Sequence, residues 1–350
     1  MKYSTLGSTD IEVSRVCLGT MTWGTQNNQQ DADEQIAFAL DKGVNFLDTA
    51  EMYSIPPTPD SYGGTETIIG DWLSRNAAIR EKIILASKIA GVGLPWVREG
   101  AIIDGDSIVK SVDASLDRLK TDYIDLYQLH WPNRQYPHFG RHWPSSFAFA
   151  KADAEKEIDS MRDILRGLKQ CVDAGKIKYC GLSNETPWGM GCYQKLAESE
   201  GLPAMVSVQN EFNLLCSKDH PYLLEQCVMD SVAYLPWSPL AGGALTGKYL
   251  DGSRPEGSRW TLTQRQGLFR DTAEMTAAVK AYKSLAEEFN LSVTQLALKW
   301  IDSVEGVTST IIGATNLQQL GDDIDAFDCE YSEELNAKVV ELLRQHSMPF

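Results

Sequence analysis

The repeated alternation of short β-rich runs with longer amphipathic helical patterns is the sequence feature that most constrains the fold. Strands are expected near residues 16–19, 44–48, 83–87, 124–129, 177–182, 205–209, 232–237 and 309–312. Helices are expected near residues 31–42, 65–75, 106–119, 155–174, 187–200, 218–229, 273–289 and 292–303. Strands that alternate with helices in this way predict a parallel sheet.

Eight such units without a second composition regime favour a closed (β/α)8 barrel, so residues 1–350 are predicted to form a single domain. Two elements are expected outside the units, namely a hairpin of Lys2–Leu6 and Ile11–Val13 turned at Gly7-Ser8, and an extra C-terminal helix over 332–346 that packs across the barrel. The alternative is an open doubly wound sheet. Its usual GxGxxG turn is missing, because the turn after the first strand reads Leu18-Gly-Thr-Met-Thr-Trp-Gly24.

Composition excludes several classes of function. The formal net charge of −16 opposes approach to a phosphate backbone, so no nucleic-acid partner is expected. No apolar run is long enough for a membrane span and the N-terminus does not resemble a signal peptide, which predicts a cytoplasmic protein without a membrane partner. The seven cysteines form no CxxC pair, as is typical of reduced thiols in a cytosol.

One segment departs from the acidic balance. Residues 240–270 hold five cations, Lys248, Arg254, Arg259, Arg265 and Arg270, against Asp251 and Glu256, and five minus two gives a local charge of +3. This segment is a candidate seat for a small anion. A random fluctuation of surface charge explains the count equally well.

Polar residues recur where the predicted strands end. These residues are Asp48, Lys88, His130, Ser183 with Asn184, Gln209, and Trp237 with Ser238. In a barrel the carboxyl ends of the strands converge on one face, which is where barrel enzymes keep their chemistry. Six strands that agree in this respect predict a functional site at that face.

The residue types at three of these ends suit proton donation. Asp48 and Lys88 belong to neighbouring units and can form a buried ion pair. Tyr53 follows Asp48 on the same loop, and its phenol needs a nearby cation to act as an acid near neutrality. Lys88 can be that cation, while His130 can hydrogen-bond to the same oxygen. Taken singly, each residue also has an ordinary explanation as a helix cap, a solvated charge or a packed aromatic.

Three segments look like the tetrad segments of the aldo-keto reductases: Phe46-Leu-Asp-Thr-Ala-Glu-Met-Tyr53, Ala86-Ser-Lys88 and Asp125-Leu-Tyr-Gln-Leu-His-Trp-Pro132. The resemblance extends through Leu18-Gly-Thr-Met, Gly181-Leu-Ser-Asn184, Gln209-Asn-Glu, Pro236–Tyr249 and Ile311-Ile-Gly-Ala-Thr315. It is greatest for the bacterial Tas-like branch. The resemblance implies an enzyme that reduces aldehydes or ketones to alcohols, with a catalytic tetrad of Asp48, Tyr53, Lys88 and His130 in which Tyr53 is the general acid.

The same resemblance implies a nicotinamide dinucleotide, with NADP expected and NAD as the alternative. Independently, amide and hydroxyl groups at Ser183, Asn184 and Gln209 can bond a carboxamide, and Trp237 offers a flat face. The implied contacts are Thr20, Met21, Ser183, Asn184, Gln209, Trp237, Ser238, Pro239, Leu240, Ala241, Gly243, Lys248, Arg259, Gly313, Thr315, Gln319, Asp322 and Asp323. Two positions depart from the family pattern, because Asn316 replaces a common arginine and Asp323 a common asparagine.

Three questions stay open at this point. Potassium-channel β subunits resemble the same family as nucleotide-binding regulatory proteins, but they carry asparagine where this chain has His130. His138 and His142 suggest a metal-dependent hydrolase, although the proline and glycine around them disfavour a helix, so no metal is expected. The aromatic loop at 131–154, with Trp131, Tyr136, Phe139, Trp143, Phe147 and Phe149, predicts a flat or apolar substrate surface or a loop that packs on itself.

Overall fold

Eight parallel strands form the centre of the molecule. The computed structural model describes residues 1–146, 151–262 and 268–350. Its strands, in the spatial order β10-β3-β4-β5-β6-β7-β8-β9, are β3 (Val16–Gly19), β4 (Phe46–Asp48), β5 (Ile84–Ile89), β6 (Ile124–Leu129), β7 (Ile177–Ser183), β8 (Met205–Gln209), β9 (Ala233–Tyr234) and β10 (Thr310–Ile312). The two edges also meet, since Thr308 N donates to Tyr234 O and Ile311 N to Pro236 O, both at 2.9 Å. These bonds close the sheet, and the predicted (β/α)8 barrel is confirmed.

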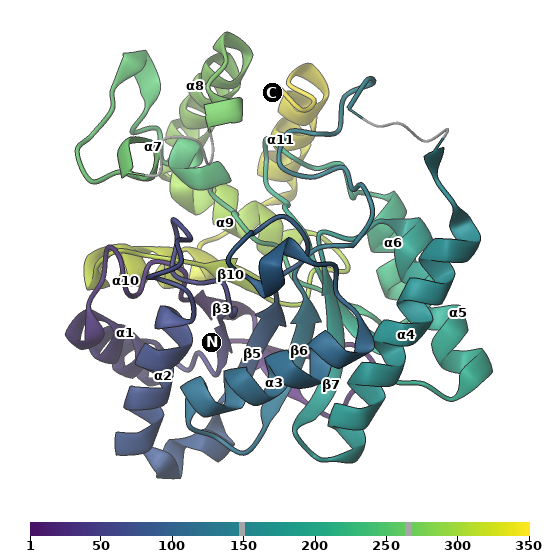
Figure 1. The fold of residues 1–350 in the computed structure, drawn as a ribbon. Helices are drawn as coiled ribbons and strands as arrows, with labels where there is room; N and C mark the ends of the chain where they lie inside the picture. Colours follow the sequence, from purple (N-terminus) through teal and green to yellow (C-terminus); the bar gives the residue numbers. More distant parts are fainter. Residues whose placement is uncertain (147–150, 263–267) are drawn as a thin grey trace.

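Helices surround the strands on their outer side, as Figure 1 shows for α2 to α6. The helices are α1 (Gln29–Asp41), α2 (Gly64–Arg75), α3 (Gly105–Leu119), α4 (Ala154–Asp173), α5 (Pro187–Glu200), α6 (Tyr222–Met229), α7 (Arg259–Leu262), α8 (Ala273–Glu288), α9 (Val293–Ser303), α10 (Leu317–Asp325) and α11 (Glu333–Gln345). Short 3-10 helices lie at Ala77–Lys82, Arg98–Gly100, Ala241–Thr246, Leu250–Gly252, Leu268–Arg270 and Ala326–Asp328. Side-chain caps begin most of the long helices, and Asn28, Asp104 and Ser292 form reciprocal capping boxes.

The predicted N-terminal hairpin is present as β1 (Tyr3–Thr5) and β2 (Glu12–Ser14), which pair antiparallel. Leu6 and Val13 are fully buried among the barrel-interior residues. Gly7 has φ +58°, and a Cβ there would lie 2.3 Å from Val206 O at the start of β8. The turn therefore needs glycine both for its backbone conformation and for its close contact with the barrel.

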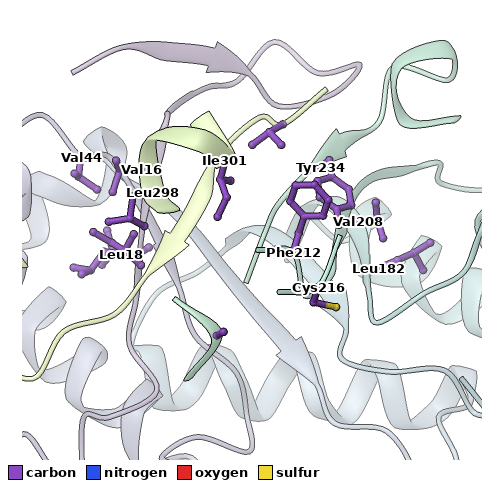
Figure 2. Packing of buried hydrophobic residues seen from close by; sticks show 14 of the residues in the cluster. Val16, Leu18, Val44, Leu182, Val208, Phe212, Cys216, Tyr234, Leu298 and Ile301 are labelled. Carbon is purple, nitrogen blue, oxygen red and sulfur yellow. The ribbon is translucent and has the colours of Figure 1, made fainter. Parts of the chain in front are cut away.

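Most apolar burial lies between the barrel and the helices. Side chains alternate along each strand, so Val16 and Leu18 of β3 face outward while Cys17 between them faces the interior. Figure 2 shows part of the outer layer, with Val16 and Leu18 near Leu298 of α9. In another part of the same view, the rings of Phe212 and Tyr234 pack edge to face with their centroids 5.7 Å apart. This packing holds the strand ends, and hence the site residues, in fixed positions.

Three predicted elements differ from the structure. The helix that follows the last strand is α10, which the sequence reading missed because only Leu317, Leu320 and Ile324 give it an apolar side. Helix α6 begins at Tyr222 and not near 218. The residue before a proline disfavours helical backbone, and His220 stands directly before Pro221. Strand β9 is shorter than 232–237 because Pro236 has no N–H, although Trp237 N still donates to Asn210 O at 2.9 Å.

The extra helix predicted over 332–346 forms α11, and it packs against α8. Figure 1 shows α8, α11 and the C-terminus together, beyond one end of the strands. The chain then returns to the loop after β6, where Trp143 Nε1 donates to Phe350 O at 3.1 Å. The rings of Phe269 and Phe350 also pack edge to face at 5.6 Å. The last residues are therefore part of the wall around the barrel mouth.

Candidate active site

Strand alternation determines which polar residues face the barrel interior. Phe46 and Ala86 lie in the interior apolar cluster, so Asp48 and Lys88, two residues further along the same strands, also point inward. On β6 the same alternation places Leu126 and Gln128 inside, and His130 follows at the carboxyl end of the strand. Below these residues the interior is apolar, and above them lie the loops.

Asp48 and Lys88 form a buried ion pair. Lys88 Nζ lies 2.6 Å from Asp48 Oδ2 and also donates to Thr49 O at 2.8 Å, and both side chains are almost fully buried. The amide groups of Gln128 and Gln209 donate to Asp48 Oδ1 at 3.1 and 2.9 Å. Burial lowers the pKa of Lys88, but the adjacent Asp48 and Tyr53 raise it by more in sum, so Lys88 is charged at neutral pH.

Tyr53 lies against Lys88, and His130 lies beside Tyr53. Lys88 Nζ is 5.0 Å from the centroid of the Tyr53 ring, and the rings of Tyr53 and His130 meet edge to face at 5.6 Å. Burial raises the pKa of Tyr53 above its ordinary value, and the charge of Lys88 offsets only part of that effect. The net lowering that the sequence argument required of Lys88 is therefore not present. Burial and the Lys88 charge hold the pKa of His130 well below its ordinary value, so this imidazole is neutral.

The residues predicted to hold a carboxamide lie together beside His130. Asn184 Nδ2 donates to His130 O at 2.8 Å, and Ser183 Oγ donates to Gln209 O at 2.8 Å. Asn184 is nearly fully buried, yet its Oδ1 has no hydrogen-bond partner in the described part of the chain. A buried acceptor of this kind is costly unless a ligand donates to it, so the site fits a carboxamide NH₂.

The loop after β9 and the start of α10 bring the other predicted contacts together. Ser238 and Ala241 adopt left-handed backbone with φ of +55° and +51°, and Ser238 Oγ accepts from Gly242 N at 2.9 Å. Asn316 caps α10, and Thr315 bonds Gln319 at 3.0 Å. Other predicted contacts on these segments are Pro239, Leu240, Gly243 and Gly313. Thr20 lies on the loop after β3, and its hydroxyl donates to Asp48 O at 2.9 Å.

The cations of the basic segment have different partners. Lys248 acts on the buried carboxyl of Asp323. Burial and the charge of Asp322 raise the pKa of Asp323 to about 7, and the charge of Lys248 lowers it in part. Arg259 Nη1 instead lies 3.3 Å from Met21 Sδ, and its charge acts on Tyr53. Arg265 lies outside the described residues. The two cations that the family pattern assigns to one phosphate both lie beside the loop after β9, where Lys248 is close to Gly243 and Arg259 is close to Gly242.

Two contacts at the mouth were not anticipated. Phe139 stacks on Trp237 with ring centroids 5.4 Å apart, and Arg270 forms a buried ion pair with Glu211. Gln128 was also missed, although its position two residues before His130 on the same strand was a usable signal. Phe139 places the aromatic loop against the site, while Phe147 and Phe149 lie outside the described residues.

The two histidines that suggested a metal have different partners. His138 Nδ1 lies 3.2 Å from Lys218 Nζ, whereas His142 Nε2 lies 3.1 Å from Phe350 O. Among the residues that the structure describes, no group of three or more His, Cys, Asp or Glu side chains could hold a metal ion. Within the same residues, no helix has the length and apolar character needed to cross a membrane. All seven cysteines are free, and five are buried.

Comparison with known proteins identifies the family. The model of the aldo/keto reductase family matches residues 15–344. The chain belongs to this family. It is 38% identical to Protein tas of Escherichia coli over 100% of this chain and 99% of that protein, which confirms the predicted likeness to the Tas-like branch.

More distant members of the aldo/keto reductase family carry more specific names. The chain is 27% identical to the versiconal hemiacetal acetate reductase of Aspergillus parasiticus, over 86% of this chain and 85% of that protein. It is 28% identical to a probable voltage-gated potassium channel subunit beta of Arabidopsis thaliana, over 94% and 92% of the two chains. Family membership supports an oxidoreductase.

Proposed function

We propose that this aldo/keto reductase uses NADP(H) to reduce small aldehydes or ketones to alcohols, with Tyr53 as the general acid. The observation that carries the proposal is the buried Lys88–Asp48 pair beneath the Tyr53 ring, beside a neutral His130. A phenol, a fixed cation and a neutral imidazole at one point form a device that can give a proton to an oxygen atom as that oxygen gains negative charge.

Each residue has a distinct part in this proposal. The nicotinamide dinucleotide, when bound, supplies the hydride that is added to the carbonyl carbon. Tyr53 gives its proton to the carbonyl oxygen, and Lys88 stabilises the phenolate that remains until solvent returns the proton. Asp48 holds the Lys88 ammonium in place and keeps it charged. His130, being neutral, can donate a hydrogen bond to the carbonyl oxygen without competing for the Tyr53 proton.

The nucleotide would lie along the residues named above. Asn184 Oδ1 would accept from the carboxamide, with Ser183 and Gln209 beside it, and Trp237 would face the nicotinamide ring. Thr20 and Met21 would contact the nucleotide from the loop after β3. The loop Ser238–Lys248 would follow the pyrophosphate, and the segment from Gly313 to Asp323 would hold the adenosine end.

The choice of NADP over NAD depends on cations near a 2′-phosphate. Lys248 supports NADP because its charge acts on Asp323 at the adenosine end. Arg259 is the second cation of the family pattern, although it contacts Met21. Asn316, Asp322 and Asp323 weaken the preference, since the first is uncharged and the others repel a phosphate. We therefore expect NADPH to bind about 10–100-fold more tightly than NADH, the range of one or two charge-assisted bonds.

Tyr53→Phe tests the assignment of the acid. The variant should lose carbonyl reduction while binding nucleotide nearly as well as the wild type, because only the phenolic hydroxyl is removed. Tyr282→Phe is the matched control, since it removes a buried phenol from α8 that bonds Leu214 O. Turnover of Tyr53→Phe within a few-fold of the wild type would refute the assignment. A wild type that binds nucleotide and reduces none of a panel of aldehydes and ketones would instead favour a regulatory subunit.

A further inference from the structure

Glu51 occupies the turn that carries Tyr53 but has no part in the proton transfer described above. The turn Ala50–Tyr53 is closed by Tyr53 N, which donates to Ala50 O at 3.0 Å, and Glu51 is its second residue. Glu51 N donates to Lys88 O at 3.0 Å, so the turn is joined directly to the strand that carries Lys88. The return of the loop is joined as well, since Gly63 N donates to Glu51 O at 2.9 Å.

The side chain of Glu51 is fully buried and accepts hydrogen bonds from four residues. Oε1 accepts from Ala90 N at 2.6 Å, at the end of β5, and from Arg98 Nη1 at 2.7 Å. Oε2 accepts from the Tyr62 hydroxyl at 3.0 Å and from Ser111 Oγ of α3. Arg98 also donates to Ala90 O, so the arginine and the carboxylate together enclose the end of β5. Ala90 N, Arg98 Nη1, the Tyr62 hydroxyl and Ser111 Oγ thus all donate to one carboxylate, two residues before Tyr53.

A buried carboxylate with this many partners is costly to assemble for stability alone. Well-packed apolar side chains often stabilise a core as well as a buried ion pair does. The ion pair differs in having fixed directions, since a fork of donors defines where the carboxylate and its turn must lie. Because Lys88 lies under the Tyr53 ring, a small movement of this turn changes the distance between the phenol and the cation.

We propose that Glu51, held by Arg98, is a positioning residue that sets the phenol of Tyr53 against Lys88 and His130. The proposal rests on the proposed function of Tyr53 as the general acid. It assigns a role to an acidic residue that touches neither Lys88 Nζ nor the His130 ring. Its effect should therefore appear in the chemical step and in the pH dependence of that step, and not in nucleotide binding.

The chain offers a matched control at the opposite end of the barrel. Asp125 is buried at the start of β6, and its Oδ2 accepts from Arg80 Nη2 at 2.8 Å and from Leu85 N at 3.0 Å. It thus shares with Glu51 a buried carboxylate, an arginine partner and a bond from a backbone N–H, which is that of Leu85 in β5 here and that of Ala90 just after β5 for Glu51. Asp125 Oδ1 also accepts from Lys178 Nζ at 2.8 Å. Asp125→Asn should reduce stability while it leaves the geometry of Tyr53 unchanged.

The experiment compares Glu51→Gln, Arg98→Met, Arg98→Lys and Asp125→Asn in the full chain, with a reducible aldehyde and NADPH. For Glu51→Gln and Arg98→Met we expect kcat to fall about 10–100-fold, because a misplacement of about 1 Å has this effect on a reacting group. The affinity for NADPH should stay within threefold of the wild type. The alkaline limb of the kcat profile should move to higher pH, because Lys88 lowers the pKa of Tyr53 less when the two are further apart. Arg98→Lys should recover part of the loss.

Three results decide the matter. If Asp125→Asn loses as much kcat as Glu51→Gln, or if the alkaline limb stays in place in both Glu51→Gln and Arg98→Met, the proposal is overturned. If Glu51→Gln does not fold, Arg98→Met decides alone, because it leaves the Glu51 carboxylate with its bonds from Ala90 N, the Tyr62 hydroxyl and Ser111 Oγ. If the wild type reduces carbonyls and Tyr53→Phe does not, the proposed function stands whatever Glu51 does, so the two failures are distinguishable.

Discussion

Replacing Lys88 with methionine measures how much the buried ion pair stabilises the fold, independently of any activity. Methionine keeps most of the aliphatic volume and removes the charge, which leaves Asp48 buried without its cation. Removal of one partner from a buried pair costs about 3–5 kcal/mol. We expect the lower end, about 3 kcal/mol, because Gln128 and Gln209 still donate to Asp48 Oδ1. Urea denaturation followed by circular dichroism measures the free energy of unfolding of each variant.

The control for Lys88→Met is Lys42→Met, which breaks a Lys–Asp pair of similar length, 2.8 Å, between the exposed side chains Lys42 and Asp325. This control should lose less than about 0.5 kcal/mol. Adding Asp48→Asn to Lys88→Met should restore about 2 kcal/mol, because the stranded charge is removed. Because the folded pKa of Lys88 is raised, its contribution is complete below about pH 10 and is lost only above that. A loss in Lys88→Met no larger than in Lys42→Met between pH 6 and 9 would refute the reasoning.

Two further predictions concern the adenosine end of the site. Lys248→Ala should weaken the binding of NADPH more than that of NADH. Arg259→Ala should do the same to a smaller degree, because Arg259 lies against Met21. Equal losses of affinity for both nucleotides in fluorescence titrations would mean that neither cation recognises the 2′-phosphate. For Asp323, whose pKa is raised to about 7, the folded state favours the protonated form, so its stabilising contribution is complete below about pH 4 and is lost as the pH rises through about 7. Asp323→Asn should therefore gain thermal stability relative to the wild type between pH 5 and pH 8, and a constant difference across that range would contradict the prediction.

The barrel could be predicted from the sequence because its signals are local and repeat. Gly175 at the end of α4 has φ +71°, and Ser332 accepts from Leu335 N at the start of α11, both as their residue types predict. The errors fell where a local pattern is weak. Helix α10 has few apolar residues, and its position depends on the closure of β10 against β3, which no local pattern contains.

The residues around the proton donor could be predicted from the sequence, but the direction in which the pKa of Tyr53 is shifted could not. Position at a strand end indicates that Asp48, Lys88 and His130 share one face of the barrel. It does not say how deeply the Tyr53 ring is buried, and burial is the larger influence on its pKa. The role of Glu51 could not be predicted from its place in the motif, since its partners Arg98 and Ser111 are 47 and 60 residues away along the chain.

The basic segment shows why a local charge count overstates an anion site. Of the four cations in 240–270 that the structure describes, Arg254 pairs with Asp271 and Arg270 with the buried Glu211. Their charges are thus largely balanced by carboxylates, and both Asp271 and Glu211 lie outside the counted window. Lys248 acts on Asp323, and Arg259 contacts Met21. Because Lys248 acts beside the carboxyls of Asp322 and Asp323, and Asn316 brings no charge, these cations support binding of the phosphates without strong selection of one phosphate, which is why we expect the preference for NADPH to be modest.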